Sequence, residues 1–220
     1  MLLFGTGGVG SWCAEALVRS GIGELGLVDF DLVCESNVNR QLQAITATLG
    51  RPKVEVLKER LLEINPECRV IARQEAFTPE NAGSFELGSA DFVIDAIDSL
   101  EDKLALIETV HASGTRLLSS MGMARRLDPT RIKPADIWAT SGCPLARRVR
   151  AGLRKRGFSG NFTVVYSDEC LANLAPETDA AEAGPNGPAS GGKMPNGSAV
   201  TVTATAGMIL ASLVLREVCG

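Results

Sequence analysis

Gly5-Thr6-Gly7-Gly8-Val9-Gly10 joins an apolar run at residues 2–4 to a helix-like segment that begins after Val9. Three of its glycines have the G-x-G-x-x-G spacing, and their missing side chains let backbone N–H groups approach a phosphate at the positive end of a helix. We therefore predict that Gly5, Gly7, Gly8 and Gly10 bind a nucleotide. The loop alone does not identify that nucleotide, because NAD enzymes share it.

Strand-like apolar runs alternate with helix-like segments through the first part of the chain. The strand candidates lie at 2–4, 25–28, 70–72, 92–97 and 117–119, and the helical segments lie after Val9 and at 53–64 and 102–112. Such alternation is typical of a parallel sheet with helices on both faces. We predict a single domain, 1–220, with a Rossmann-like α/β fold: a nucleotide-binding core at 1–123 and a C-terminal extension of mixed structure at 124–220.

The extension is basic and rich in loops, with one strand candidate at 162–167 and a Gly- and Pro-rich stretch at 184–197 that we expect to be a loop. Residues 197–215 carry no charge, and this run is about as long as a membrane-spanning helix. Five Ser and Thr side chains interrupt this run, and charged residues follow it closely. We therefore expect a buried packing segment, with a membrane anchor as the less favoured alternative.

Composition narrows the class of protein. The net charge of -4 over 220 residues argues against a surface that attracts nucleic acid everywhere. The six cysteines form no C-x-x-C pair, so we expect reduced thiols in the cytoplasm and no zinc site. We interpret each cysteine as a small buried apolar side chain and assign no catalytic role to Cys143 or Cys170.

A polar segment follows the second strand candidate. Asp29 stands 19 residues after Gly10, where a carboxylate accepts hydrogen bonds from ribose hydroxyl groups in Rossmann nucleotide sites. The run from Asp29 to Gln41, followed by Gly50-Arg51-Pro52-Lys53, contains an aspartate, an S-N-x-x-R-Q pattern and a G-x-x-K pattern in that order. This order resembles the ThiF-like adenylyltransferases related to ubiquitin-activating enzymes. The resemblance implies ATP-binding roles for Asp29, Asp31, Ser36, Asn37, Asn39, Arg40 and Lys53.

Adenylate formation explains why these residue types occur together. A carboxylate that displaces pyrophosphate brings anions together, so cations must offset the charge of the transition state. We predict that Arg40 and Lys53 supply these cations. The run Asp95-Ala96-Ile97-Asp98-Ser99 resembles the family's D-x-x-D-[NS] pattern, which implies that Asp98 is catalytic and holds Mg²⁺ beside the phosphates of ATP, with Ser99 also in the ATP site. We interpret Asp95 as structural; the alternative role for Ser99 is a helix cap.

Within this family the chain looks like the tRNA threonylcarbamoyladenosine dehydratases. The residues that carry this resemblance include Gly7 to Trp12, Ile64 to Cys68, Val93 to Ser99, Asp128-Pro129-Thr130 and Val202 to Thr205. It implies that ATP adenylates the threonyl carboxylate of the modified adenosine, after which the ureido oxygen closes a ring and expels AMP. Three alternatives remain: an activator of a sulfur-carrier or ubiquitin-like protein, a catalytically inactive nucleotide-binding member, and, more distantly, an NAD oxidoreductase.

A basic stretch supports a tRNA substrate independently. Residues 125–156 contain ten Lys or Arg and two acids, a net charge of +8, whereas the other 188 residues carry 12 basic and 24 acidic side chains, or -12. Leu145, Val149 and Leu153 recur every fourth residue, which predicts one apolar helix face. The remaining positions hold cations that we predict bind tRNA phosphates, although a solvated face is the plainer interpretation: Arg147, Arg148, Arg150, Arg154, Lys155 and Arg156.

The family resemblance also implies partners. Its members are often homodimers, in which a helical segment ahead of the glycine loop supplies an arginine to the partner subunit's ATP; the sequence begins in its first strand, without that segment. Some members work with a cysteine desulfurase and sulfur-acceptor system. Arg125-Arg126 departs from the family pattern, in which smaller residues are usual.

Overall fold

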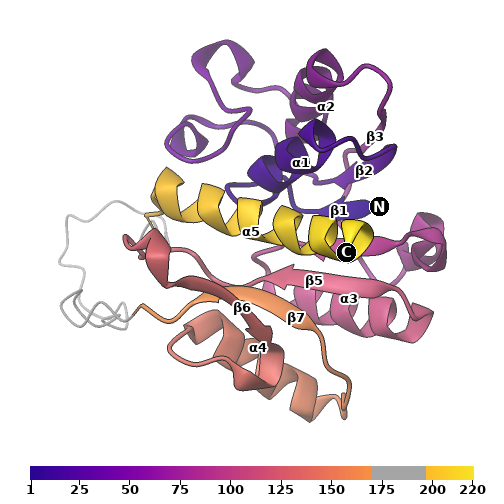
Figure 1. The fold of residues 1–220 in the computed structure, drawn as a ribbon, viewed down its shortest axis with the longest axis vertical. Helices are drawn as coiled ribbons and strands as arrows, with labels where there is room; N and C mark the ends of the chain where they lie inside the picture. Colours follow the sequence, from indigo (N-terminus) through magenta and orange to yellow (C-terminus); the bar gives the residue numbers. More distant parts are fainter. Residues whose placement is uncertain (170–196) are drawn as a thin grey trace, which may run out of the picture.

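A computed structural model describes residues 1–169 and 197–220. Its centre is a seven-stranded sheet with the order β3-β2-β1-β4-β5-β7-β6, in which β6 alone runs antiparallel (Figure 1). The expected Rossmann-like, mostly parallel sheet is therefore confirmed. The strands are β1 (Leu2–Phe4), β2 (Glu24–Val28), β3 (Arg69–Arg73), β4 (Phe92–Asp95), β5 (Arg116–Ser120), β6 (Ile132–Asp136) and β7 (Thr163–Ser167).

Helices cover both faces of the sheet. One face packs against α1, α2 and α5, and the other packs against α3 and α4. The described α-helices are α1 (Gly10–Arg19), α2 (Lys53–Ile64), α3 (Leu100–Ser113), α4 (Pro144–Lys155) and α5 (Val200–Cys219). Short 3-10 turns occur at η1 (Glu35–Asn37), η2 (Thr46–Thr48), η3 (Ala82–Phe85), η4 (Leu87–Ser89), η5 (Pro129–Arg131) and η6 (Ile137–Ala139).

The order of the strands reverses at β1. Its neighbours are β2 on one side and β4 on the other, so that Phe4 pairs in register with Val28 and with Asp95. The connections to α1 and α3 therefore leave in opposite directions from the same edge of the sheet. This opens a crevice at the carboxyl ends of the strands, which is where open α/β sheets bind their ligands.

The structure corrects two parts of the sequence analysis. The strand expected at 92–97 ends at Asp95, because the Asp95 side chain accepts a hydrogen bond from the Ile97 amide and turns the chain out of the sheet. The second correction is β6, which was not predicted and contains Pro134. An edge strand tolerates proline, since it has no partner on its outer side.

The charge-free segment near the end of the chain forms α5, which lies along α1 (Figure 1). A Cβ atom at Gly207 would come within 2.5 Å of the Val9 carbonyl oxygen, so glycine allows the two helices to touch. Val202, Leu210 and Val214 are fully buried, which agrees with the expected packing segment. Among the described helices, α5 alone is long and apolar enough to cross a membrane by length and composition. The expected loop at 184–197 lies outside the described residues except for Gly197.

Candidate active site

The glycine loop connects β1 to α1 at the switch in strand order. Gly5 has a φ of +87°, and a Cβ atom there would lie 2.6 Å from the Ala96 carbonyl oxygen. A Cβ atom at Gly10 would lie 1.9 Å from the Gly5 carbonyl oxygen. The fold itself therefore requires these two glycines. A Cβ atom at Gly7 would meet nothing closer than Gln41 Nε2 at 3.8 Å, so this position leaves room for a ligand beside the start of α1.

Asp29 fixes the shape of the loop from the end of β2. Its Oδ2 accepts hydrogen bonds from the Thr6 amide at 2.7 Å and the Thr6 hydroxyl at 3.0 Å, and its Oδ1 accepts one from the Asp31 amide at 2.9 Å. Each carboxylate oxygen has two lone pairs, so Oδ1 can still accept one hydrogen bond from a ribose hydroxyl. Thr6 was not singled out in the sequence, where it is a variable position of the glycine pattern.

Arg40 lies against the glycine loop. A Cβ atom at Gly8 would come within 3.2 Å of Arg40 Cγ, and Trp12 Nε1 donates to the Arg40 carbonyl oxygen at 3.1 Å. The guanidinium Nη1 donates to the Ser36 carbonyl oxygen at 2.6 Å and to Asn39 Oδ1 at 3.0 Å. These contacts orient the guanidinium through one of its nitrogens, so its other N–H groups can face phosphate oxygens.

The other polar residues of this segment build the loop that carries Arg40. Asn37 is buried, and its Oδ1 accepts from the Cys34 amide at 3.0 Å. Asn39 Nδ2 donates to the Ser198 carbonyl oxygen at 2.9 Å, which ties the loop to the residues before α5. Ser36 is exposed and contributes its backbone carbonyl to Arg40. The structure thus places these three residues beside the site as supports of Arg40.

Lys53 is the first residue of α2, and its side chain is 6% exposed. A cation at this helix end is unfavourable, because the amino end of a helix is itself positive. Its Nζ forms an ion pair of 2.6 Å with Asp31 Oδ2, and its amide donates to the Asp31 carbonyl oxygen at 3.0 Å. Since Asp31 in turn bonds Asp29, the Lys53 ammonium belongs to the same cluster as the glycine loop.

Asp98 follows β4 at the same edge of the sheet. It is exposed and makes no hydrogen bond or ion pair with the described residues. Ala96 and Ile97 pack against Gly5, which keeps Asp98 close to the loop. Ser99 occupies the N-cap position of α3 but makes no capping bond through its hydroxyl in the described structure. Within residues 1–169 and 197–220, no group of three His, Cys, Asp or Glu side chains is placed to hold a metal ion.

Two buried glutamines next to the loop were not proposed as site residues. Gln43 Nε2 donates to the Thr6 carbonyl oxygen at 2.8 Å, whereas Gln41 lies beside Gly7. The side-chain oxygens of both are buried without a hydrogen-bond partner in the structure. Buried acceptors of this kind usually have a partner, and a nucleotide in the crevice would supply donors. Gln41 is the last residue of the S-N-x-x-R-Q pattern, and this position was the signal in the sequence that could have marked it as a site residue.

The predicted tRNA-binding side chains lie on and just after α4, whose inner face buries Val149 and Leu153 and half-buries Leu145. Arg147, Arg148 and Lys155 are exposed. The other three are engaged: Arg150 donates to Thr140 Oγ1, Arg154 lies 5.2 Å from the centre of the Trp138 ring, and Arg156 pairs with Glu108 at 2.7 Å and Glu101 at 2.6 Å. Of these six cations only Arg156 is paired with carboxylates of the described residues, so the charge at the end of α4 is lower than the sequence span suggested.

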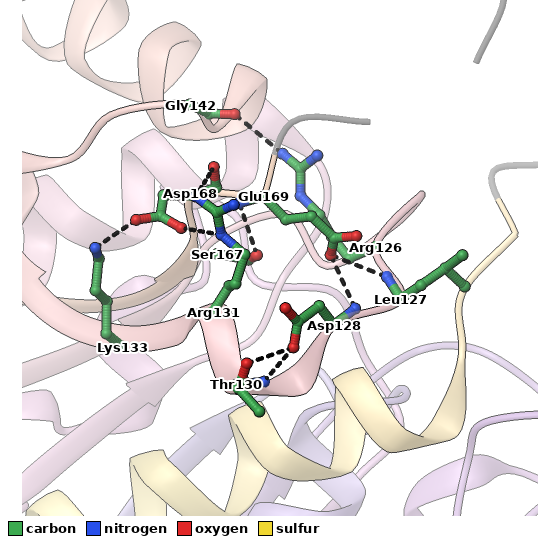
Figure 2. Close-up of polar contacts among 10 residues, drawn as sticks. All are labelled: Arg126, Leu127, Asp128, Thr130, Arg131, Lys133, Gly142, Ser167, Asp168 and Glu169. Carbon is green, nitrogen blue, oxygen red and sulfur yellow. Dashed lines mark hydrogen bonds and ion pairs between the residues drawn. The ribbon is translucent and has the colours of Figure 1, made fainter. Parts of the chain in front are cut away.

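A second polar cluster lies where β7 ends and β6 begins (Figure 2). Arg131 and Lys133 both pair with Asp168, and their hydrogen bonds hold the pKa of that carboxyl below its usual range. Buried Glu169 accepts from the Leu127 amide at 2.9 Å and the Asp128 amide at 3.0 Å. Two further cations of the basic stretch thus share one carboxylate, Asp168, from outside it.

The cysteines divide into two groups. Cys13, Cys68 and Cys143 are buried, and burial raises the pKa of the Cys13 and Cys68 thiols. Cys34 and Cys219 are exposed, which corrects the expectation that each cysteine is a buried apolar side chain. Both lie in positions that little of the chain covers, one before η1 and the other in the last turn of α5. Cys170 lies outside the described residues.

Comparison with known proteins identifies the family. The ThiF family profile matches residues 1–220. This chain belongs to the ThiF family. Among the relatives of this ThiF-family chain, the tRNA threonylcarbamoyladenosine dehydratase of Bacillus subtilis is 40% identical over 215 residues, which are 98% of this chain and 85% of the relative.

Solved structures agree with this assignment. The tRNA N6-threonylcarbamoyladenosine dehydratase of Escherichia coli in complex with ATP has a TM-score of 0.84 and 36% identity, over 99% of this chain and 84% of that one.

A more distant relative, the adenylyltransferase and sulfurtransferase MOCS3 of Drosophila willistoni, is 37% identical over 106 residues, only 48% of this chain and 23% of the relative. The similarity to the dehydratases therefore extends over about twice as much of this chain as the similarity to MOCS3.

Proposed function

We propose that this ThiF-family chain is an ATP-dependent dehydratase of threonylcarbamoyladenosine in tRNA. The observation that carries the proposal is the convergence of two cations on the glycine loop: Arg40 against Gly8, and Lys53 through Asp31 and Asp29. A dinucleotide-binding enzyme has no need of this pair, whereas attack at a phosphate by a carboxylate does. Matches to dehydratases from Bacillus subtilis and Escherichia coli that span nearly all of this chain support the choice of substrate.

The first step joins the threonyl carboxylate to the α-phosphorus of ATP and releases pyrophosphate. The amides at the start of α1 bind the phosphates, and Asp29 accepts hydrogen bonds from the ribose. Arg40 and Lys53 offset the negative charge that grows as the two anions meet. Because the described structure already fixes both cations through Ser36, Asn39 and Asp31, little reorganisation is required at the moment of reaction.

The second step closes the ring. The ureido oxygen attacks the activated carbonyl carbon, and AMP leaves with one former carboxylate oxygen. The substrate has then lost the elements of one water molecule, while ATP has become AMP and pyrophosphate. This scheme requires no enzyme thiol. The burial of Cys143 against Gly122, whose carbonyl oxygen lies 4.0 Å from its Sγ, agrees with a packing role.

Mg²⁺ would be held by Asp98 together with the phosphates of ATP. A carboxylate at the end of a strand, exposed and without a partner among the described residues, fits an ion that commonly takes only one or two protein carboxylates when it is bound to a triphosphate. When bound, Mg²⁺ would neutralise part of the charge on the leaving pyrophosphate. The contribution of Asp98 is to present an oxygen ligand at the edge where Gly5 begins the loop.

We further propose that tRNA binds along the outer face of α4. The exposed side chains Arg147, Arg148 and Lys155 are the cations best placed to neutralise phosphates, and Arg154 keeps its charge while stacked on Trp138. Arg156, which two glutamates already pair, contributes less. The substrate's overall negative charge makes such binding dependent on salt.

A homodimer is the proposed assembly. Large apolar side chains are exposed around the loop that carries Arg40, including Phe30 at 60%, Ile45 at 54% and Val38 at 46% exposed. Grouped exposed apolar residues favour an interface. Light scattering of the purified protein tests this part directly: a mass of one chain at micromolar concentration contradicts it.

The decisive experiment for the activity is mass measurement of nucleosides. Purified protein is incubated with ATP, Mg²⁺ and tRNA that bears threonylcarbamoyladenosine. The tRNA is then digested to nucleosides, and their masses are measured by mass spectrometry. Loss of one water together with AMP release is expected, and neither is expected with unmodified tRNA. An unchanged nucleoside mass would refute the proposed activity. Pyrophosphate exchange that depends on a sulfur-carrier protein would instead favour the activator, for which the shorter match to MOCS3 is the supporting observation.

A further inference from the structure

A buried ion pair lies directly beneath the candidate active site. Asp95, the last residue of β4, and Lys103, in the first turns of α3, both have side chains that are 0% exposed. Lys103 Nζ lies 2.6 Å from Asp95 Oδ2. Removing two charges from water is costly, and apolar residues of similar volume are often at least as stabilising, so stability alone is a weak explanation for such a pair.

Every hydrogen-bonding group of the pair is used. The Lys103 ammonium donates to Asp95 Oδ2, to the Ser120 carbonyl oxygen at 3.1 Å and to Ser119 Oγ at 3.4 Å. Asp95 Oδ2 also accepts from the Ser119 hydroxyl at 2.6 Å, and Oδ1 accepts from the Ile97 amide at 3.0 Å. The network thus joins the ends of β4 and β5 to the start of α3 with defined directions.

The turn that carries Asp98 is held at both ends. On one side the Asp95 side chain accepts from the Ile97 amide at 3.0 Å. On the other side Ser99 is the N-cap of α3, the helix that the Lys103 ammonium ties to Asp95, and its carbonyl oxygen accepts the backbone bond from the Lys103 amide at 3.1 Å. Asp98 is exposed and makes no hydrogen bond or ion pair of its own with the described residues. The position of its carboxylate is therefore set by the turn in which it sits.

The same ammonium also holds the end of β5 through the Ser120 carbonyl oxygen. Ser120 ends β5, and the chain continues from it into residues 121–126, where the Arg125 amide donates to the Gly197 carbonyl oxygen at 2.9 Å. Ser198, the next residue, accepts from Asn39, whose Oδ1 orients Arg40. The buried pair is therefore linked to the turn that carries Asp98 and, through residues 121–126 and 197–198, to the loop that carries Arg40.

We propose that Asp95 and Lys103 are positioning residues that fix Asp98 relative to the Ser120 segment, so that the ATP side and the substrate side of the site keep the spacing required for adenylation. This inference rests on the proposed function. It assigns to the pair no contact with either substrate. Misplacement of reacting groups by ~1 Å costs about 10²-fold in rate, so the effect belongs in kcat.

The test replaces the pair with apolar side chains, as Asp95→Leu/Lys103→Met. The double variant is expected to fold, to bind ATP within about threefold of the unaltered protein, to lose about 10²-fold in kcat and to exchange the Ile97 amide faster with deuterium. Ser119→Ala removes one hydrogen bond to Asp95 and is expected to give a smaller change of the same kind. If the double variant does not fold, Ser119→Ala decides the question.

Val110→Ala is the matched control, because Val110 is fully buried on the same helix and its apolar side chain takes no part in the hydrogen bonds of the network. It is expected to lower thermal stability while leaving the kcat of the folded protein and the Ile97 exchange rate unchanged. A folded Ser119→Ala or double variant with unaltered kcat and unaltered exchange would overturn the inference. If the unaltered protein has no dehydratase activity, the proposed function is refuted. Deuterium exchange at Ile97 does not depend on catalysis, so it still tests whether the ion pair fixes the turn.

Discussion

Replacing Lys53 by Met separates catalysis from folding at the candidate active site. Methionine retains the apolar stem that packs where the Lys53 side chain is 6% exposed, and it removes only the ammonium group. Asp31, the ion-pair partner, has a side chain that is 47% exposed, so water can hydrate its carboxylate after the change. The loss of such a pair costs about 0–1 kcal/mol.

A second effect acts in the opposite direction. Lys53 is the first residue of α2, and removing a cation from the positive end of a helix stabilises that helix by roughly 0.3–1 kcal/mol. The two contributions nearly cancel, so the free energy of unfolding should change by less than ~1 kcal/mol. The transition state loses a fixed positive charge, which typically lowers kcat by about 10²–10³-fold.

Thermal or urea denaturation measures the first quantity, and AMP release with modified tRNA measures the second. Lys58→Met on the same helix is the control, because Lys58 has no ion pair among the described residues and lies beyond the site. A variant that is several kcal/mol less stable, yet turns over normally per folded molecule, would refute the assignment of Lys53 to the transition state and make it a structural ion-pair residue.

Three further outcomes are expected. Gly7→Ala should fold and weaken ATP binding, whereas Gly10→Ala should abolish folding, because its Cβ atom would lie 1.9 Å from the Gly5 carbonyl oxygen. Circular dichroism measures folding, and calorimetric titration measures ATP binding. If both variants fold equally well or both fail to fold, the ligand role of Gly7 is contradicted. The double change Arg147→Ala/Arg148→Ala should lower tRNA affinity and reduce the magnitude of the salt slope by about 1–2, whereas Arg156→Ala should hardly change that slope, and filter binding over a salt series measures both. Burial alone would raise the pKa of Glu15, but hydrogen bonds from Arg60 and Arg19 lower it overall. The stability that ionised Glu15 contributes is therefore present above its unfolded pKa near 4.5 and is lost as the pH falls through the lower folded pKa. Arg60→Ala should therefore reduce the loss of stability between pH 6 and pH 3 in urea titrations, and an identical pH dependence in the variant would contradict this account.

The sequence was sufficient for the parts of the fold that depend on local pattern. The glycine spacing, the alternation of apolar runs and helix-like segments, and the apolar face of Leu145, Val149 and Leu153 each correspond to an observed element. The helix expected at 53–64 has those bounds in the structure. β6 was missed because its burial pattern is irregular and Pro134 interrupts it, so its place at the edge depends on pairing with β7.

The candidate site was predictable in its residue types and unpredictable in its contacts. Motif order indicated Asp29, Arg40, Lys53 and Asp98, and the structure brings them to one edge of the sheet. Their partners come from distant positions, such as Ser198 for Asn39 and Glu101 for Arg156, and no local pattern specifies those. For the same reason the basic stretch looked more positive in the sequence than on the folded surface.

The contact between α5 and the glycine loop joins two segments that are far apart in the sequence. Thr203 lies 3.3 Å from where a Cβ atom of Gly8 would stand, and Gly207 lies against Val9, so the first loop of the chain is completed by its last helix. α5 follows β1 by nearly 200 positions, so the packing against the glycine loop depends on a segment far away in the sequence. A chain cut before Val200 would retain all seven strands, the last of which ends at Ser167, and would lose the helix that packs against the glycine loop.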